Sequence, residues 1–222
     1  MDETRGMLKE KLIRAKERWA REGRLLTGKA GDPERERIPP GQREVRDFPV
    51  LDLGVVPRVR PETWRLDIGG HVERPLSWSW AEFKAQPQVE IVSDIHCVTA
   101  WSRLDNRWAG VAARHMIESA KPKPDSRHVI LHSLDGYTTN VPLPVFAGED
   151  VLLAHAWEGE PLAPEHGGPV RVVIPRLYFW KSAKWLARIE FVAQDAPGFW
   201  EVRGYHNEGD PWQEERYGSP KR

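Results

Sequence analysis

The sequence predicts a β-rich, mixed α+β fold, and three observations lead to this prediction. The 222 residues are enough for one large domain or two small ones. Hydrophobic residues make up 40% of the chain, which suits a protein with a packed core. Short strand-like runs outnumber the segments with helical periodicity. We divide the chain into an N-terminal helix with an irregular arm, residues 1–47, and a main domain, residues 48–222.

The first half of the chain begins with a predicted surface helix. Apolar residues recur at three- and four-residue spacing among the charges of residues 1–26. Glycine, proline and charge over 28–47 predict an irregular arm. A strand is expected at 64–68. A short helix is expected to start at Ser79, where Ser-Trp-Ala-Glu has the spacing of a capping box, and to end before Pro87.

The second half is expected to contain mostly strands and turns. A strand at 89–93 leads into the loop that carries Cys97, and a helix follows at 112–120. The turn pair Asp135-Gly136 predicts a hairpin. Further strands are expected at 128–133, 151–157, 170–174 and 189–192.

The charge balance limits the classes of partner. Lysine plus arginine and aspartate plus glutamate each total 33, so the formal net charge is zero. Such a chain lacks the basic excess typical of nucleic-acid binding. Residues 1–26 are charged throughout, with no apolar run typical of a signal peptide, and no segment has the length of a membrane span. We therefore expect a soluble, cytoplasmic protein; the sequence gives no signal for its oligomeric state.

Cys97 is the only cysteine of the chain, which leaves no disulfide framework. Its chemistry allows three interpretations: a small buried hydrophobe, a reactive thiolate beside a base, or a soft metal ligand. A structural zinc site of the cysteine-rich type would need further thiols. The spacings HExxH, GxSxG, GxGxxG and the P-loop are absent, so the common zinc-protease, hydrolase and nucleotide-binding classes lack support.

A second stretch, residues 166–186, gathers groups that suit an anionic ligand. Two glycines follow His166 and allow close backbone approach. Arg171 can hold a phosphate bidentately, Lys181 and Lys184 add positive charge, and Ser182 adds a hydroxyl donor. The alternative is a solvated basic face with ordinary turn glycines.

Together these stretches resemble the sulfite oxidase family. Residues 97–102 (CVTAWS), followed by 108–111 (WAGV), are similar to its cofactor loop. The similarity is greatest to the branch with the bacterial subunit that reduces oxidised methionine in periplasmic proteins. Residues 166–171 (HGGPVR) and 181–186 (KSAKWL) resemble the family's pterin-binding segments. The resemblance covers roughly 48–195.

The resemblance implies the sulfite oxidase molybdopterin-binding fold and a mononuclear molybdenum–molybdopterin cofactor. In this interpretation Cys97 is the catalytic residue and the protein's metal ligand. The residues carried over by position to the pterin and its phosphate are Ser133, His166, Arg171, Lys181, Ser182 and Lys184. Molybdenum is soft enough to favour a thiolate, and a metal-bound thiol is deprotonated.

The activity implied is that of a molybdopterin-dependent oxidoreductase, transferring an oxygen atom to or from a small, possibly sulfur-containing substrate. Electrons would pass through a separate, unidentified partner, because the sequence has no haem-attachment motif or cysteine cluster. Trp101 and Tyr137 are candidates for the pocket wall. Arg103 and Arg107 follow Cys97 closely and are candidates for the arginines that line the family's substrate pocket; the alternative is that they are solvated loop charges. At the family's first pterin contact this chain offers only backbone and Asp52.

Two rival functions come from other classes. One is a non-enzymatic domain that retains the fold, which loss of the metal ligand would favour. The other is a hydrolase in which Cys97 is the nucleophile and His96 or His132 the base. Metal content separates the hydrolase from the oxidoreductase.

Overall fold

The chain folds around two mixed β-sheets. The computed structural model describes residues 2–21 and 37–218. In the first sheet β5 pairs with β1, β4 and β8, and β8 also pairs with β9 and β10. Its strands are β1 (Arg43–Glu44), β4 (Gln88–Cys97), β5 (Trp101–Ala112), β8 (Leu152–Trp157), β9 (Glu160–Pro161) and β10 (Arg171–Val173).

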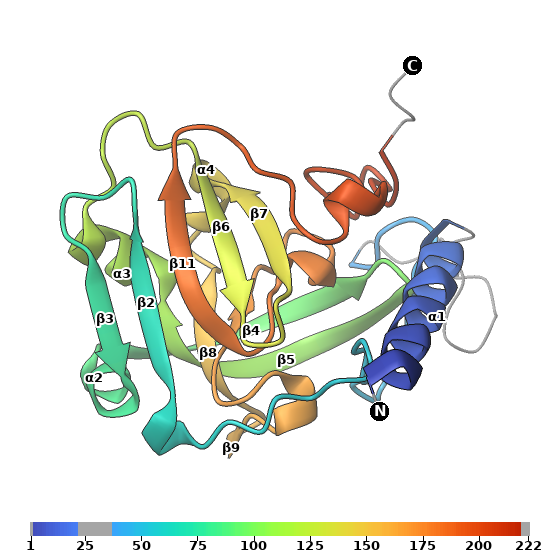
Figure 1. The fold of residues 1–222 in the computed structure, drawn as a ribbon, viewed down its shortest axis with the longest axis horizontal. Coiled ribbons are helices and arrows are strands. Elements are labelled where there is room, and N and C mark those ends of the chain that lie inside the picture. Colours follow the sequence, from blue (N-terminus) through green and yellow to red (C-terminus); the bar gives the residue numbers. More distant parts are fainter. Residues whose placement is uncertain (1, 22–36, 219–222) are drawn as a thin grey trace.

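The second sheet has the order β3-β2-β11-β6-β7. Its strands are β2 (Arg65–Gly70), β3 (Leu76–Ser79), β6 (His128–Ser133), β7 (Thr138–Pro142) and β11 (Leu186–Val192). β11 pairs in parallel with β2 and antiparallel with β6. The helices are α1 (Asp2–Arg21), α2 (Trp80–Ala85), α3 (Ala113–Ala120) and α4 (Leu143–Phe146) (Figure 1). The predicted β-rich α+β fold class is confirmed.

Most predicted elements form where their patterns place them. The capping box is present at α2: Ser79 Oγ accepts from the Glu82 backbone N–H, and the Glu82 carboxylate accepts from the Ser79 N–H at 2.7 Å. The strand predicted at 128–133 is β6, and Asp135-Gly136 lies between β6 and β7. Of the predicted arm, 28–36 lies outside the described residues, and the arm's Arg43–Glu44 forms β1. The domain boundary at 47/48 stays a prediction.

The longest strand of the described chain, β5, is absent from the sequence prediction. Its sequence, WSRLDNRWAGVA, mixes charge, amide and glycine with tryptophan, and we interpreted its first residues as a cofactor loop. β5 forms because it pairs with other strands on both of its edges, and because the side chains of its own Trp101 and Trp108 are buried in the core. Tertiary packing therefore decides this element rather than intrinsic strand preference.

Two hydrophobic clusters form the core. The larger lies between the second sheet, α3 and the ends of β8 and β10. The smaller surrounds the β4–β5 hairpin and includes Ile13 of α1 together with Cys97, Ala100 and Trp101. α1 therefore packs at the turn of this hairpin, as Figure 1 shows. The burial of Ile13 agrees with the predicted surface helix packed on the body.

Candidate functional site

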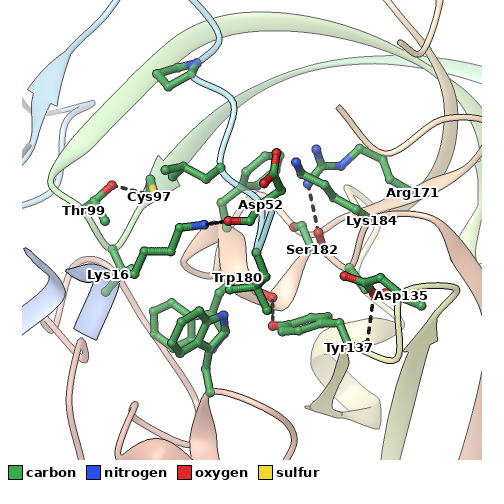
Figure 2. Close-up of a pocket in the computed structure, with 18 of the residues that line it drawn as sticks. Lys16, Asp52, Cys97, Thr99, Asp135, Tyr137, Arg171, Trp180, Ser182 and Lys184 are labelled. Atoms are coloured by element: carbon green, nitrogen blue, oxygen red, sulfur yellow. Dashed lines mark hydrogen bonds between the residues drawn. The ribbon is translucent and has the colours of Figure 1, made fainter. Parts of the chain in front are cut away.

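A cavity of about 840 Å³, a volume that includes its open mouth, lies beside the smaller core cluster. It is bounded by the β4–β5 turn, the β6–β7 turn, the stretch 48–53 and the stretch 179–185. Its lining combines aromatic side chains with a few charged and hydroxyl groups, as is typical of pockets that hold organic ligands. Figure 2 shows Cys97 on one side of this cavity and Arg171, Ser182 and Lys184 across from it.

Cys97 ends β4 and lines the cavity. A tight turn, with Ala100 at a φ of 63°, connects it to β5, so the thiol lies at the end of a rigid hairpin. Its Sγ is 3.1 Å from Thr99 Oγ1. Burial raises the pKa of the Cys97 thiol, against smaller opposing effects of Thr99, Lys16 and Arg216. Such a thiol is neutral and weakly nucleophilic until a metal or a base removes its proton.

Arg171 is fully buried on β10 and lines the cavity opposite Cys97. Its Nη1 donates to the His166 carbonyl at 2.8 Å and its Nη2 to the Ser182 carbonyl at 2.9 Å. Nε donates to the Val172 carbonyl at 3.3 Å. Burial lowers the pKa of Arg171 to about 9, and no carboxylate pairs with it in the described part of the chain. One N–H on each terminal nitrogen is left for a ligand.

Lys184 lines the same side of the cavity, and its ammonium donates to the Glu165 carbonyl. Burial, followed by the nearby Arg171 cation, lowers the pKa of Lys184 to about 7. Gly167, at a φ of 104°, makes room for the Lys184 stem, because a Cβ there would lie 2.9 Å from Lys184 Cβ. This glycine therefore serves packing within the chain as well as the turn.

Two predicted serines lie in the cavity wall. Ser182 Oγ accepts from the Ile174 backbone N–H at 3.0 Å, which fixes this turn against β10. Ser133, at the end of β6, is buried, and its Oγ has no hydrogen-bond partner among the described residues. Buried hydroxyls are normally paired, so the Ser133 hydroxyl is available to a group bound in the cavity.

The other two predicted residues, His166 and Lys181, do not line the cavity. The His166 ring stacks on Phe48 at a centroid distance of 4.0 Å, and its Nε2 is 3.1 Å from the Phe48 carbonyl. Lys181 is fully buried, and its ammonium lies 2.7 Å from the Glu201 carboxylate. It also donates to the Asn140 carbonyl and amide oxygen at 2.9 Å. His166 thus contacts the wall, and the positive charge of Lys181 is neutralised inside the fold.

The structure adds residues to the cavity that the motifs did not indicate. Lys16 of α1 reaches in from the N-terminal helix, and its ammonium donates to the Asp52 carbonyl. Asp135 lines the cavity as well, and burial raises the pKa of its carboxyl group. The turn pair Asp135-Gly136 predicts a hairpin, but it does not indicate that the Asp135 carboxyl group faces a cavity. Lys16 is one of many charged residues on a surface helix, and nothing local distinguishes it.

The expected pocket wall is only partly formed as predicted. Trp101 and Tyr137 line the cavity, and Tyr137 donates from its hydroxyl to the Trp180 carbonyl at 2.6 Å. Arg103 lies over the Trp157 ring at 4.6 Å and donates to Asn106. Neither Arg103 nor Arg107 lines the cavity.

The two histidines considered as bases are engaged elsewhere. His96 is buried, its Nδ1 is 2.8 Å from Ser102 Oγ, and burial lowers its pKa to about 4. His132 Nε2 is 3.0 Å from the Glu190 carboxylate on the second sheet. Neither ring lines the cavity. Within the ranges that the structure describes, no group of three or more histidine, cysteine or acidic side chains could hold a metal ion.

The fold and this cavity define the class of protein. The chain belongs to the oxidoreductase molybdopterin binding domain family, whose model matches residues 53–200. The resemblance to the sulfite oxidase family is therefore confirmed. Within the described residues no helix is long and apolar enough to cross a membrane.

Curated relatives lie at two levels of similarity. "Uncharacterized oxidoreductase YuiH" of Bacillus subtilis (strain 168) is 52% identical over 182 residues, covering 82% of this chain and 92% of that protein. The protein-methionine-sulfoxide reductase catalytic subunit MsrP of Campylobacter jejuni is 29% identical and covers 63% of this chain and 52% of its own. Sulfite oxidase of Gallus gallus is 28% identical and covers 68% of this chain and 39% of its own. The chain thus spans about half the length of these two relatives or less.

A solved structure supports the fold. The sulfane dehydrogenase SoxCD from Paracoccus pantotrophus superposes with a TM-score of 0.58, covering 63% of this chain and 40% of that one. At 21% sequence identity this likeness shows the fold alone.

Proposed function

We propose that this protein is a molybdenum-cofactor-dependent oxidoreductase that transfers an oxygen atom to or from a small, sulfur-containing substrate. One observation carries the proposal: a single cavity places the soft Cys97 thiol across from the buried Arg171 and the half-buried Lys184. The family binds a molybdopterin, which carries a metal at one end and a phosphate at the other. The cavity has chemical groups that suit each of these two ends. The thiol suits a soft metal, and the cations suit a phosphate.

The residues present fit the phosphate end of such a cofactor. Burial lowers the pKa of both Arg171 and Lys184, and neither forms an ion pair with a described carboxylate. Two cations brought together out of water without a counter-ion are unfavourable, and a phosphate dianion would offset that cost. Ser182 and the unpaired hydroxyl of Ser133 would add donors along the same wall.

The residues also fit the metal end. Cys97 would hold the metal, since its thiol lies in the cavity at the end of a hairpin with no histidine partner among the described residues. His166 would act indirectly, by positioning two residues that line the cavity. Its ring stacks on Phe48, and its carbonyl accepts a hydrogen bond from Arg171. Lys181 would act through the ion pair beneath Trp180 rather than on the cofactor.

When bound, the cofactor supplies a two-electron redox centre that exchanges an oxygen atom with the substrate. The chain's own residues orient that group, and the aromatic wall of Trp101, Tyr137 and Trp180 excludes water around it. Electrons would be exchanged with a redox partner, because this part of the molecule contains a single cysteine and no haem-attachment motif. The name of the MsrP relative, a catalytic subunit, agrees with a separate partner. The cytoplasmic location stays a prediction, tested by cell fractionation.

Elemental analysis tests this proposal on protein produced in a host that makes the cofactor. We expect close to one molybdenum per wild-type chain and a changed metal-centre spectrum in Cys97→Ala. Absence of molybdenum, in a host that loads other molybdoenzymes, would contradict the proposal. A metal-free protein with a reactive thiol would then favour the hydrolase.

A further inference from the structure

The N-terminal helix contributes a charged group to the cavity, outside the region that the family model covers. α1 is anchored to the body by buried Ile13, and the Tyr205 hydroxyl donates to the Lys16 carbonyl at 3.2 Å. Lys16 lies one turn after Ile13 on the helix, so its side chain leaves the same face and enters the cavity. Figure 2 shows it extended toward Asp52 on the side of the cavity where Cys97 lies.

The Lys16 ammonium is desolvated and weakly compensated. Its hydrogen bond goes to the Asp52 backbone carbonyl, while the Asp52 carboxylate accepts from the Gly54 N–H at 2.7 Å. No ion pair between Lys16 and a carboxylate occurs among the described residues. Burial lowers the pKa of Lys16 to about 8, although the nearby Asp52 carboxylate opposes this effect. An anion in the cavity would supply the missing counter-charge.

The position of Lys16 separates it from the cations assigned to the cofactor phosphate. Arg171 and Lys184 lie across the cavity, whereas Lys16 extends into it from the side where Cys97 lies. A phosphate held by Arg171 and Lys184 therefore leaves the Lys16 charge for a second anion beside the thiol. The two arginines considered for substrate binding, Arg103 and Arg107, lie outside the cavity.

We propose that Lys16, carried by α1, is a substrate-binding residue that holds an oxygen of a small oxyanion beside Cys97. The inference rests on the proposed function and narrows its substrate class to compact anions, in preference to neutral sulfoxides. In this proposal α1 contributes a substrate-binding side chain to the pocket, in addition to packing on the surface of the domain.

The test compares four molybdenum-loaded proteins: wild type, Lys16→Gln, Lys16→Arg and Lys11→Gln. Lys11 is an exposed lysine of the same helix, so its variant makes the same change of net charge away from the cavity. Sulfate is the anionic probe and dimethyl sulfone its neutral counterpart, both titrated at constant ionic strength. Tryptophan fluorescence reports binding, because Trp101, Trp180 and Trp200 line the cavity.

We expect Lys16→Gln to weaken sulfate binding by at least about tenfold, as for loss of one charge-assisted hydrogen bond. Lys16→Arg should stay within about threefold of the wild type, Lys11→Gln should match it, and dimethyl sulfone should not distinguish the proteins. Equal sulfate affinity in Lys16→Gln and Lys11→Gln, or no sulfate binding by the wild type, overturns the inference. So does a molybdenum content that falls in Lys16→Gln alone, because Lys16 would then hold the cofactor.

The molybdenum content also separates the two proposals. Absence of molybdenum from all four proteins contradicts the proposed function and this inference together. Full molybdenum loading without the expected difference in sulfate affinity contradicts the inference alone.

Discussion

At the scale of single residues, the cavity is defined by polar groups whose partners are incomplete. Ser133 has a buried hydroxyl with no partner among the described residues, and Arg171 donates only to carbonyls. A buried polar group without a partner destabilises the fold, and a ligand that forms a hydrogen bond with it offsets that cost. Two predictions follow from this difference.

The first prediction concerns Ser133→Ala. Because the hydroxyl has no partner to lose, we expect the free energy of unfolding of cofactor-free protein to change by less than about 1 kcal/mol. Cofactor retention should fall, measured as molybdenum and pterin remaining after dialysis. Ser93→Ala is the matched control, since Ser93 Oγ is also buried and unpaired but lies outside the cavity. Equal retention in both variants would remove Ser133 from the site.

The second prediction is a pH dependence of stability. The pKa of Lys184 is about 7 in the fold against an ordinary value of 10.5, so the unfolded chain binds more protons between these values. The contribution of neutral Lys184 to stability is therefore complete above pH 10.5. It decreases as the pH falls and is lost once the pH has fallen through about 7. We expect the free energy of unfolding of cofactor-free protein to rise from pH 7 to 9.

Chemical denaturation at several pH values checks this expectation. Lys16, with a pKa lowered to about 8, contributes a slope of the same sign above about pH 8, and Arg171, with a pKa lowered to about 9, does so only above about pH 9. Lys184→Met should reduce the slope, Lys11→Met should leave it unchanged, and bound cofactor should reduce it because phosphate favours the charged lysine. An identical slope in Lys184→Met and wild type would refute the assignment.

At the scale of elements, the β4–β5 hairpin decides where the thiol lies. Its two strands are held in antiparallel register from Gln88↔Val111 to Cys97↔Trp101, with one irregularity between Ser93 and Ile95. This register fixes Cys97 opposite Trp101 at the closed end, where α1 packs. A turn of this length leaves little freedom for Cys97 to move relative to the sheet, which suits a group that must bind at a set position.

At the scale of the whole molecule, a buried ion pair joins segments that are distant in sequence. The Glu201 carboxylate lies 2.7 Å from Lys181 Nζ and accepts from Trp180 Nε1 and Thr139 Oγ1 at 2.9 Å. The side chains of Lys181 and Glu201 are 0% and 2% exposed, so removal of one partner leaves an uncompensated buried charge. Because Trp180 lines the cavity, the pair supports the pocket wall from behind.

The third prediction is therefore that Glu201→Gln costs about 3 kcal/mol or more of unfolding free energy. The double variant Lys181→Met with Glu201→Gln should cost less than the sum of the single variants, since no charge is then left unpaired. Urea denaturation of the three variants measures both quantities. A cost below about 1 kcal/mol for Glu201→Gln would show that water reaches the pair.

The sequence by itself determined the family, most elements and the local segments of the site. Capping, turn and periodicity signals are local, so α2, α3, β6 and the β6–β7 turn lie where their residues predict. Cys97, Ser133, Arg171, Ser182 and Lys184, which the resemblance assigns to the cofactor, line one cavity, and their roles there stay predictions. Only the tertiary structure placed β5 in the sheet, directed Lys181 to Glu201 and brought Lys16 to Cys97. These outcomes depend on contacts between distant segments, and burial and charge there are set by the neighbours that folding supplies.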